Sequence, residues 1–213
     1  QITGIDVPGE RAGLLPSPAW KKRARKLPWY PGETLIAGIG QGFMLTTPLQ
    51  LAHATAIVAT RGTVTIPHFL EHIEGADDTL SLSAAMYERP AVVLEDDGHW
   101  DAVIEAMVEV VHGPTGTARA SGKNAPVRFA GKTGTAQVFG VAQDVDINKQ
   151  EVPEHLQDHA LFVAVAPVDA PQIAIAIVVE NGGGGSSTAA PIARRLIDKF
   201  FIRQATAEPP TSG

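Results

Sequence analysis

The chain has 213 residues, a formal net charge of −6 with a pI near 5.6, and no cysteine. The acidic balance argues against a nucleic-acid-binding protein, and the lack of thiols excludes disulfides, a thiolate nucleophile and thiolate-bound zinc. Hydrophobic residues make up 44% of the chain, enough for a packed core. No apolar run reaches the roughly 18 residues of a membrane span. Because the chain starts at Gln1 and has no signal segment, we expect a piece of a longer polypeptide.

Residues 1–34 are rich in proline and glycine, which predicts a long ordered loop with little regular structure. Inside it, a basic run at residues 21–26 stands beside Trp29 and Tyr30. Such a run can be a solvated cationic loop, a docking surface for an anionic polymer or substrate, or a site for nucleic acid or anionic lipid. One short cluster in an acidic chain favours the solvated loop.

The sequence Gly-Ile-Gly-Gln-Gly at residues 38–42 lacks the flanking strand of a dinucleotide-binding loop, and its third glycine is not at the required spacing, so we exclude that function. Thr47, Pro48 and Gln50 instead predict the capped start of a helix that runs to about residue 60. Residues 63–73 then predict a strand that is broken by a proline.

A second helix is predicted over residues 98–111, capped by Asp96 or Asp97 and preceded by a short candidate strand at residues 92–94. Its expected apolar side consists of Trp100, Val103, Ile104, Met107, Val108 and Val111. A short turn or helix over residues 115–121 follows and carries Arg119.

The central prediction is a strand over residues 127–139. The two-residue period of a strand places on one face Thr133, Thr135, Gln137 and Phe139. Gly134 interrupts the strand, which often marks the close approach of another backbone or a ligand. Two hydroxyls and the ammonium of Lys132 can hold a carboxylate, so we interpret this strand as an edge that pairs with an extended, carboxylate-bearing peptide. The alternative is a surface strand whose glycine forms a bulge.

Residues 141–158 are charged, and we expect them to form a mobile connection. His155 and His159 have helical i, i+4 spacing, but no third ligand is suggested, and we predict no metal site. Residues 160–166 and 172–180 predict two strands that form a hairpin, the second continuously apolar and therefore buried.

The glycine-rich residues 181–187 lack the Gly-Lys-Ser/Thr ending of a phosphate-binding loop, and we interpret them as a flexible turn. Ser187 or Thr188 is expected to cap a terminal helix over residues 189–202. The residues of this helix expected to face the sheet are Ile192, Leu196, Ile197 and Phe200. Residues 204–213 have the composition of a disordered tail.

Several of these motifs together resemble one family. Lys132-Thr133-Gly134-Thr135-Ala136 resembles the Lys-Thr-Gly element of penicillin-binding proteins and serine β-lactamases. The glycine motif at residues 38–42 with Thr47-Pro48-Leu49-Gln50, the strand from Asp158-His159 to Ala166-Pro167, and Glu180-Asn181-Gly182-Gly183 resemble class B transpeptidases. The loop containing Pro28-Trp29-Tyr30 and the run 133–139 look most like the penicillin-binding protein 2 type, the cell-elongation transpeptidases of Gram-negative bacteria. The resemblance covers nearly the whole chain.

The resemblance implies an α/β fold of the α+β type, with the antiparallel sheet flanked by helices found in β-lactamases and transpeptidases. It implies that residues 1–203 are the C-terminal part of a transpeptidase domain, followed by the tail 204–213. The sheet would be incomplete in this chain, which leaves an edge that the missing part must cover.

The implied chemistry is acyl transfer without a cofactor or metal. A serine attacks the D-Ala-D-Ala bond of a peptidoglycan stem peptide, and β-lactams trap the acyl-enzyme. The resemblance implies catalytic roles for Lys132 and Thr135, the latter through its backbone N–H in the oxyanion hole. It implies that Thr133, Gly134 and Thr135 bind the substrate, the hydroxyls holding its carboxylate.

Two elements of the family are missing. No Ser-x-x-Lys, which supplies nucleophile and base, and no Ser-x-Asn or Ser-x-Asp occurs in the chain. We therefore expect the nucleophile outside this chain and no catalysis by the chain alone. The resemblance further implies a protein anchored at the periplasmic face of the bacterial inner membrane. It would build cell wall and cell shape beside a membrane glycan polymerase and other elongation-complex proteins.

Two other functions stay open. A serine β-lactamase or D,D-carboxypeptidase relative would share Lys132-Thr133-Gly134 and would turn a β-lactam over. A non-catalytic β-lactam-sensing domain of the same fold would be acylated without transpeptidation. The Gly-Gln-Gly and Thr-Pro-Leu-Gln motifs and the Pro-Trp-Tyr loop argue against the first.

Overall fold

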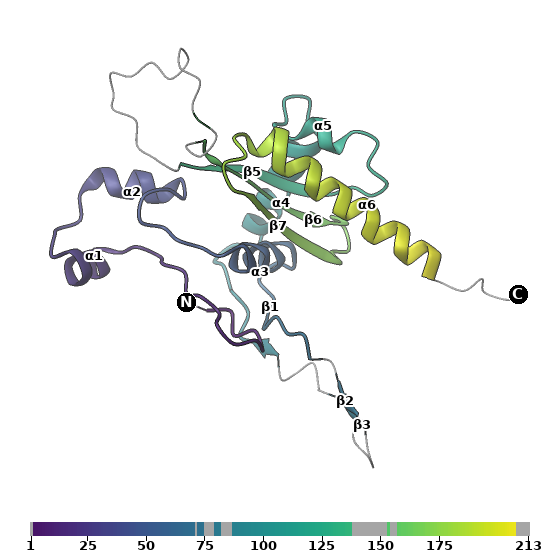
Figure 1. Cartoon of the computed structure of the whole chain (residues 1–213), viewed down its shortest axis with the longest axis horizontal. Coiled ribbons are helices and arrows are strands. Elements are labelled where there is room, and N and C mark those ends of the chain that lie inside the picture. Colours follow the sequence, from purple (N-terminus) through teal and green to yellow (C-terminus); the bar gives the residue numbers. More distant parts are fainter. Residues whose placement is uncertain are drawn as a thin grey trace, which may run out of the picture. The chain divides into compact units, whose positions relative to one another are not determined.

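The structure is a computed structural model, and it describes residues 2–70, 72–74, 79–81, 87–137, 153 and 157–207 (Figure 1). Residues 1–53 with 64–91 form one compact unit, and residues 54–63 with 92–213 form a second. The predicted connection over residues 141–158 lies almost wholly outside the described residues, as does Phe139.

The first unit contains α1 (Pro18–Arg25), α2 (Pro31–Gly38) and the start of α3 (Pro48–Ala59). It also contains two short antiparallel strand pairs. In these, β1 (Val64–Thr65) pairs with β4 (Glu88–Arg89), and β2 (His72–Glu74) pairs with β3 (Thr79–Ser81). The single strand predicted over residues 63–73 is thus reduced to its two ends.

The prediction of a loop with little regular structure over residues 1–34 is confirmed for residues 2–17 and wrong from residue 18 onward, because two of its prolines begin helices. Pro18 opens α1 at a position where a helix needs no backbone N–H, and the Ser17 Oγ accepts a hydrogen bond from the Trp20 N–H at 3.1 Å. Pro31 opens α2, where the Glu33 carboxylate accepts from the Tyr30 N–H at 2.8 Å.

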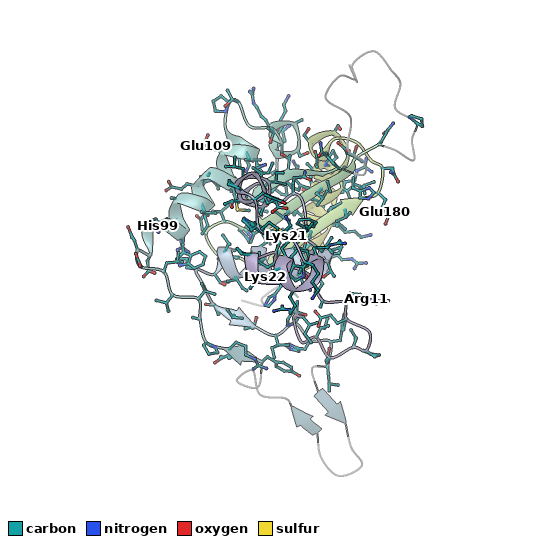
Figure 2. All side chains as sticks on the ribbon, turned by 90° about the vertical axis from the view of Figure 1, so that its left-hand side faces the viewer. Arg11, Lys21, Lys22, His99, Glu109 and Glu180 are labelled. Carbon is teal, nitrogen blue, oxygen red and sulfur yellow. The ribbon has the colours of Figure 1, made fainter. Side chains whose placement is uncertain are left out.

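The basic run belongs to α1 and is not simply a solvated loop. Lys21 is only 2% exposed, forms an ion pair with Glu33, and places its Nζ 4.3 Å from the centre of the Tyr30 ring. Lys22, next to it on the helix, is exposed (Figure 2). One member of the run therefore holds α1 to α2, while its neighbours face solvent.

The start of α3 confirms the predicted capping box. The Thr47 N–H donates to the Gln50 Oε1 at 3.1 Å, and the Gln50 N–H donates to the Thr47 Oγ1 at 3.2 Å. Each side chain thus satisfies a backbone donor that the first helical turn leaves unpaired.

The second unit holds the principal sheet, with strand order β5-β6-β7 and antiparallel pairing throughout. Its strands are β5 (Ala130–Ala136), β6 (His159–Ala166) and β7 (Ile173–Val179). Besides the end of α3, the unit contains the helices α4 (Gly98–His112), α5 (Arg119–Gly122) and α6 (Ala190–Ala207), the last preceded by the π-helical turn η4 (Gly185–Ala189). An antiparallel sheet flanked by helices and a β6–β7 hairpin are both as predicted.

The core of this unit lies between the sheet and its helices. On one face, Phe162 of β6 and Ile197 of α6 are fully buried in a cluster with Val111 of α4 and Phe129. A smaller cluster combines Ala130 and Val165 of the sheet with Val108 of α4. Helix α4 contacts β5, and α6 runs across β6 and β7 (Figure 1).

Several details differ from the sequence predictions. No strand forms at residues 92–94, and Val103 points to solvent from α4. Helix α6 continues to Ala207, past the predicted end at residue 202 and into the predicted tail. Of the residues predicted to face the sheet, Ile197 is fully buried as expected, whereas Ile192 and Leu196 are 39% and 45% exposed.

The predicted cap of the terminal helix is also wrong. The Ser187 and Thr188 hydroxyls donate to the carbonyls of Gly184 and Gly182, so neither is seen accepting from a helix N–H. The π-helical turn begins earlier, at Gly185.

Candidate active site

The predicted strand edge is β5, which lies at the border of the described sheet and pairs only with β6 there. Residues directly opposite each other in an antiparallel pair lie on the same face. Thr133 and Thr135 are opposite Phe162 and Ala160, so the two hydroxyl residues share one face, as predicted. Lys132 and Gly134 are opposite Val163 and Leu161 and belong to the other face. The lysine and the threonines therefore flank the strand edge from two sides.

Lys132 is exposed, and its Nζ donates a hydrogen bond to the carbonyl of Thr133 at 2.7 Å. The ammonium thus lies along the strand, and it forms no ion pair with any residue that the structure describes. A flexible, exposed ammonium with three donors can exchange such a carbonyl for an anionic ligand or another polar group.

Thr133 has a hydrogen-bonding partner that no sequence motif predicts. Its Oγ1 lies 3.1 Å from the Oγ1 of Thr117, a residue in the turn between α4 and α5. Either hydroxyl can be the donor, since each carries one hydrogen and two lone pairs. The site therefore contains a linked hydroxyl pair from segments 16 positions apart (133 − 117). No local pattern could reveal it.

Glycines allow the backbone around this strand to pack closely. A Cβ at Gly131 would lie 2.5 Å from the Cζ of buried Phe162, so no side chain fits there. A Cβ at Gly185 would lie 2.6 Å from the carbonyl oxygen of Gly134 and 2.4 Å from that of Leu161. The backbone of η4 thus rests on β5 and β6 at Gly134, in agreement with the predicted close approach of a second backbone.

The glycine-rich segment 181–185 is held to the start of β6 by its own hydrogen bonds. The Asn181 N–H donates to the His159 Nδ1 and its Nδ2 donates to the Gln157 carbonyl, each at 2.9 Å. The Gly183 N–H donates to the Asp158 carbonyl at 2.8 Å. Because His159 Nδ1 accepts, the ring proton of the neutral imidazole belongs on Nε2. The sequence predicts a flexible turn over residues 181–187, whereas Asn181 and Gly183 are hydrogen-bonded to residues 157–159.

Neither metal binding nor membrane insertion is indicated by the described part of the chain. No group of three or more potential metal ligands occurs among the described residues, and His155 lies outside them. None of the described helices has the length and apolar character needed to cross a bilayer.

Residues 1–198 match the family model of the penicillin-binding protein transpeptidase domain. The chain belongs to this transpeptidase family, which confirms the resemblance found in the sequence and the expected fold. Within the family it is of the MrdA type. It is 38% identical over 209 residues to the peptidoglycan D,D-transpeptidase MrdA of Salmonella typhimurium, a match that covers 98% of this chain and 33% of that protein. The chain therefore spans about one third of the length of this relative.

Solved structures agree with the sequence relationship. The penicillin-binding protein PBP2 of Pseudomonas aeruginosa in complex with WCK 5153 is 42% identical, with a TM-score of 0.75 over 92% of this chain and 40% of that chain. PBP2 of Helicobacter pylori, solved in complex with MreC, is 29% identical, with a TM-score of 0.77 over 95% of this chain and 34% of that chain.

Proposed function

We propose that this chain forms the Lys-Thr-Gly wall of the active site of a peptidoglycan D,D-transpeptidase. The observation that carries the proposal is the edge strand β5, with two threonine hydroxyls on one face and the Lys132 ammonium on the other. The nucleophilic serine belongs to a part of the longer protein outside this chain, since the sequence contains no Ser-x-x-Lys.

The proposed reaction is acyl transfer through a serine ester. The serine Oγ attacks the carbonyl of the penultimate D-alanine, and the terminal D-alanine leaves with the proton that the serine gave up. The amine of a neighbouring stem peptide then attacks the ester and forms the cross-link. A β-lactam acylates the same serine, but its ring-opened product remains attached.

Each residue of the Lys-Thr-Gly element has a distinct role in this proposal. The hydroxyls of Thr133 and Thr135 donate to the carboxylate of the donor peptide, and Lys132 supplies positive charge beside the nucleophile. The backbone N–H of Thr135 is one oxyanion-hole donor, a contact worth roughly 10²–10³ in rate. Gly134 leaves the strand edge low enough for an extended peptide to lie along it.

The longer protein would act at the periplasmic face of the inner membrane, where stem peptides are cross-linked. Residues 1–203 would be the C-terminal part of its transpeptidase domain, with 204–213 as a tail. A glycan polymerase and elongation-complex proteins are the proposed partners, and the MreC complex of the Helicobacter pylori relative supports this. These assignments carry no cofactor and no metal.

The test is labelling with a fluorescent penicillin, followed by a denaturing gel. We expect the full-length protein that carries this chain to be labelled covalently and the 213-residue chain alone to remain unlabelled. Labelling of the isolated chain would place the nucleophile within it and refute the proposal. Rapid loss of label through turnover would instead indicate a β-lactamase or carboxypeptidase, and stable label without cross-linking activity would indicate a sensing domain.

Two substitutions in the full-length protein assign the hydroxyls. Thr133→Val and Thr135→Val should each slow acylation by about tenfold or more, because a hydrogen bond to a charged group is worth about 1.5–3 kcal/mol. Thr115→Val is the matched control, an exposed threonine of the α4–α5 turn outside the proposed site. Equal effects of all three variants would contradict the assignment.

A further inference from the structure

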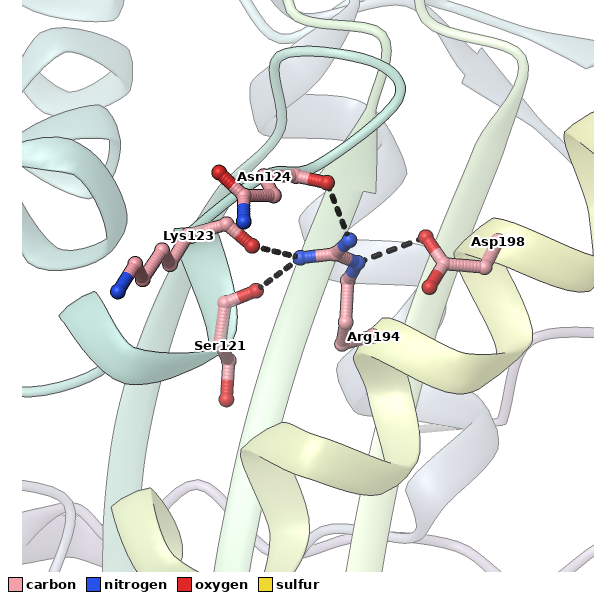
Figure 3. Close-up of polar contacts among 5 residues, drawn as sticks. All are labelled: Ser121, Lys123, Asn124, Arg194 and Asp198. Carbon is pink, nitrogen blue, oxygen red and sulfur yellow. Dashed lines mark hydrogen bonds and ion pairs between the residues drawn. The ribbon is translucent and has the colours of Figure 1, made fainter.

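Arg194 of α6 makes the densest set of side-chain hydrogen bonds in the described second unit, and it lies outside the Lys-Thr-Gly element (Figure 3). Its Nη1 donates to the carbonyls of Ser121 and Lys123 at 2.7 and 2.8 Å, and its Nη2 donates to that of Asn124 at 2.7 Å. Its Nε donates to the Asp198 carboxylate at 2.7 Å, one turn further along α6.

The three carbonyls belong to the end of α5 and the turn that leaves it. Carbonyls at a helix end have no intrahelical partner, and Asn124 turns the chain with a φ of +54°. A planar guanidinium reaches three carbonyls and a carboxylate at once because its donors point in fixed, divergent directions. Arg194 therefore fixes the course of this turn from a different element of the fold.

The other side of α5 is held against α4. A Cβ at Gly116 would lie 2.4 Å from the carbonyl oxygens of Glu109 and Val110, and one at Gly122 would lie 2.2 Å from that of Val111. The buried Ala118 donates its N–H to the Val110 carbonyl at 2.9 Å. Segment 116–124 is thus clamped between α4 and Arg194.

Thr117 is the exposed residue between two anchored neighbours in this clamped segment, and its hydroxyl meets that of Thr133. The direction of this hydrogen bond decides what Thr133 can do. When Thr117 donates to Thr133, the Thr133 hydrogen is left for a carboxylate, and the two bonds polarise each other. A displacement of the segment by about 1 Å would take the pair out of hydrogen-bonding range.

We propose that Arg194 is a positioning residue for carboxylate recognition, acting through segment 116–124 and the Thr117 hydroxyl on Thr133. This inference rests on the proposed function, because it presumes that Thr133 binds the carboxylate of the donor peptide or β-lactam. It adds a residue of the C-terminal helix to the determinants of substrate selection.

The measurement is the ratio of the acylation rates of the full-length protein by benzylpenicillin and by its methyl ester, which lacks the carboxylate charge. Arg194→Lys keeps the positive charge but cannot span three carbonyls, so the ratio should fall by about three- to tenfold, the value of one net hydrogen bond. Thr117→Val should lower it similarly, and the double variant should be no worse than Thr117→Val alone. Arg195→Lys is the matched control, because Arg195 is exposed and makes no hydrogen bond or ion pair within the described residues.

A merely structural role for Arg194 would lower the melting temperature and both acylation rates without changing their ratio, and that result would overturn the inference. If Arg194→Lys does not fold, Thr117→Val decides, since an unchanged ratio in that exposed-site variant removes the only route by which Arg194 could act. Failure of the proposed function is a different outcome, in which the wild-type protein is not acylated at all.

Discussion

The two glycines of β5 should respond in opposite ways to the same added methyl group. Gly131→Ala places a Cβ 2.5 Å from the Phe162 Cζ and 2.8 Å from the Val163 carbonyl oxygen, inside the packed core. Gly134→Ala places its Cβ 3.2 Å from the Cβ of half-buried Leu161, with no other atom within 4 Å among the described residues beyond its chain neighbours. The methyl group at residue 131 therefore clashes with packed core atoms, whereas the methyl group at residue 134 contacts a single described side chain on the face that carries Lys132.

These distances set the expected magnitudes. Overpacking at Gly131 should lower the free energy of unfolding by about 1–3 kcal/mol, because neither the buried ring nor the β6 backbone can move away cheaply. At Gly134, a shift of a few tenths of an ångström relieves the contact. Alanine also lowers the conformational entropy of the unfolded chain, which stabilises the folded state by about 0.4–1 kcal/mol. The stability of Gly134→Ala should therefore stay within about 1 kcal/mol of wild type.

The rate of penicillin acylation should fall more in Gly134→Ala than in Gly131→Ala. A methyl group at residue 134 displaces a ligand lying along the strand edge, and a displacement of about 1 Å at a reacting centre can cost about 10²-fold in rate. Thermal denaturation and penicillin acylation of the full-length protein measure both quantities. The reasoning fails if Gly131→Ala is as stable as wild type, or if Gly134→Ala loses more stability than Gly131→Ala.

Two further predictions concern the second backbone layer and the first unit. Gly185→Ala should lower stability and acylation together, because its Cβ would lie 2.4 Å from the Leu161 carbonyl oxygen and push η4 off the strand pair. Unchanged stability and acylation in this variant would show that η4 can move away from β5 and β6 without cost. Hydrogen bonds from Lys21 and from the Tyr30 N–H lower the pKa of Glu33 from its ordinary value of 4.5. Its stabilising contribution should be present above that value and vanish as the pH falls through the lowered pKa, so wild type and Glu33→Gln should differ in urea midpoint at pH 7 and converge in acid.

The sequence was sufficient for the parts of the fold that repeat a local pattern. The apolar run of β7, the alternation along β5 and the Thr47–Gln50 capping box each record their structure within a few neighbouring residues. The prediction for residues 1–34 failed from residue 18 onward, because proline can open a helix as well as interrupt one. Ser17-Pro18 and Tyr30-Pro31 start helices, whereas the count of prolines and glycines alone indicated a loop.

Some residues of the candidate site could likewise be predicted from the sequence, and others could not. The shared face of Thr133 and Thr135 was predicted from the two-residue period of a strand, whereas the site roles of Lys132 and both threonines were implied by the family resemblance. Thr117 and Arg194 were not, because an exposed threonine in a turn and a polar residue on a helix have no local signature of contact. Their partners lie 16 positions (133 − 117) and about 70 positions away in the chain. Only the packing of α4 and α6 around the sheet brings these groups together.

The glycines around β5 are visible in the sequence, but their role becomes clear only from the packing. A glycine in a sequence usually indicates conformational freedom of the backbone. In this structure an added side chain would clash with a neighbouring backbone or core atom at four glycines, Gly116, Gly122, Gly131 and Gly185. Gly116 and Gly122 let the segment around α5 lie against the backbone of α4, and Gly185 lets η4 lie against the backbones of β5 and β6. A strand edge held in this way has little freedom to shift, so the position of Thr133 depends on residues that never touch a ligand. For that reason, substitutions on α6 should change how strongly β5 prefers ligands that carry a carboxylate. A chain with the same Lys-Thr-Gly triplet but larger residues at these four glycine positions should lack this preference.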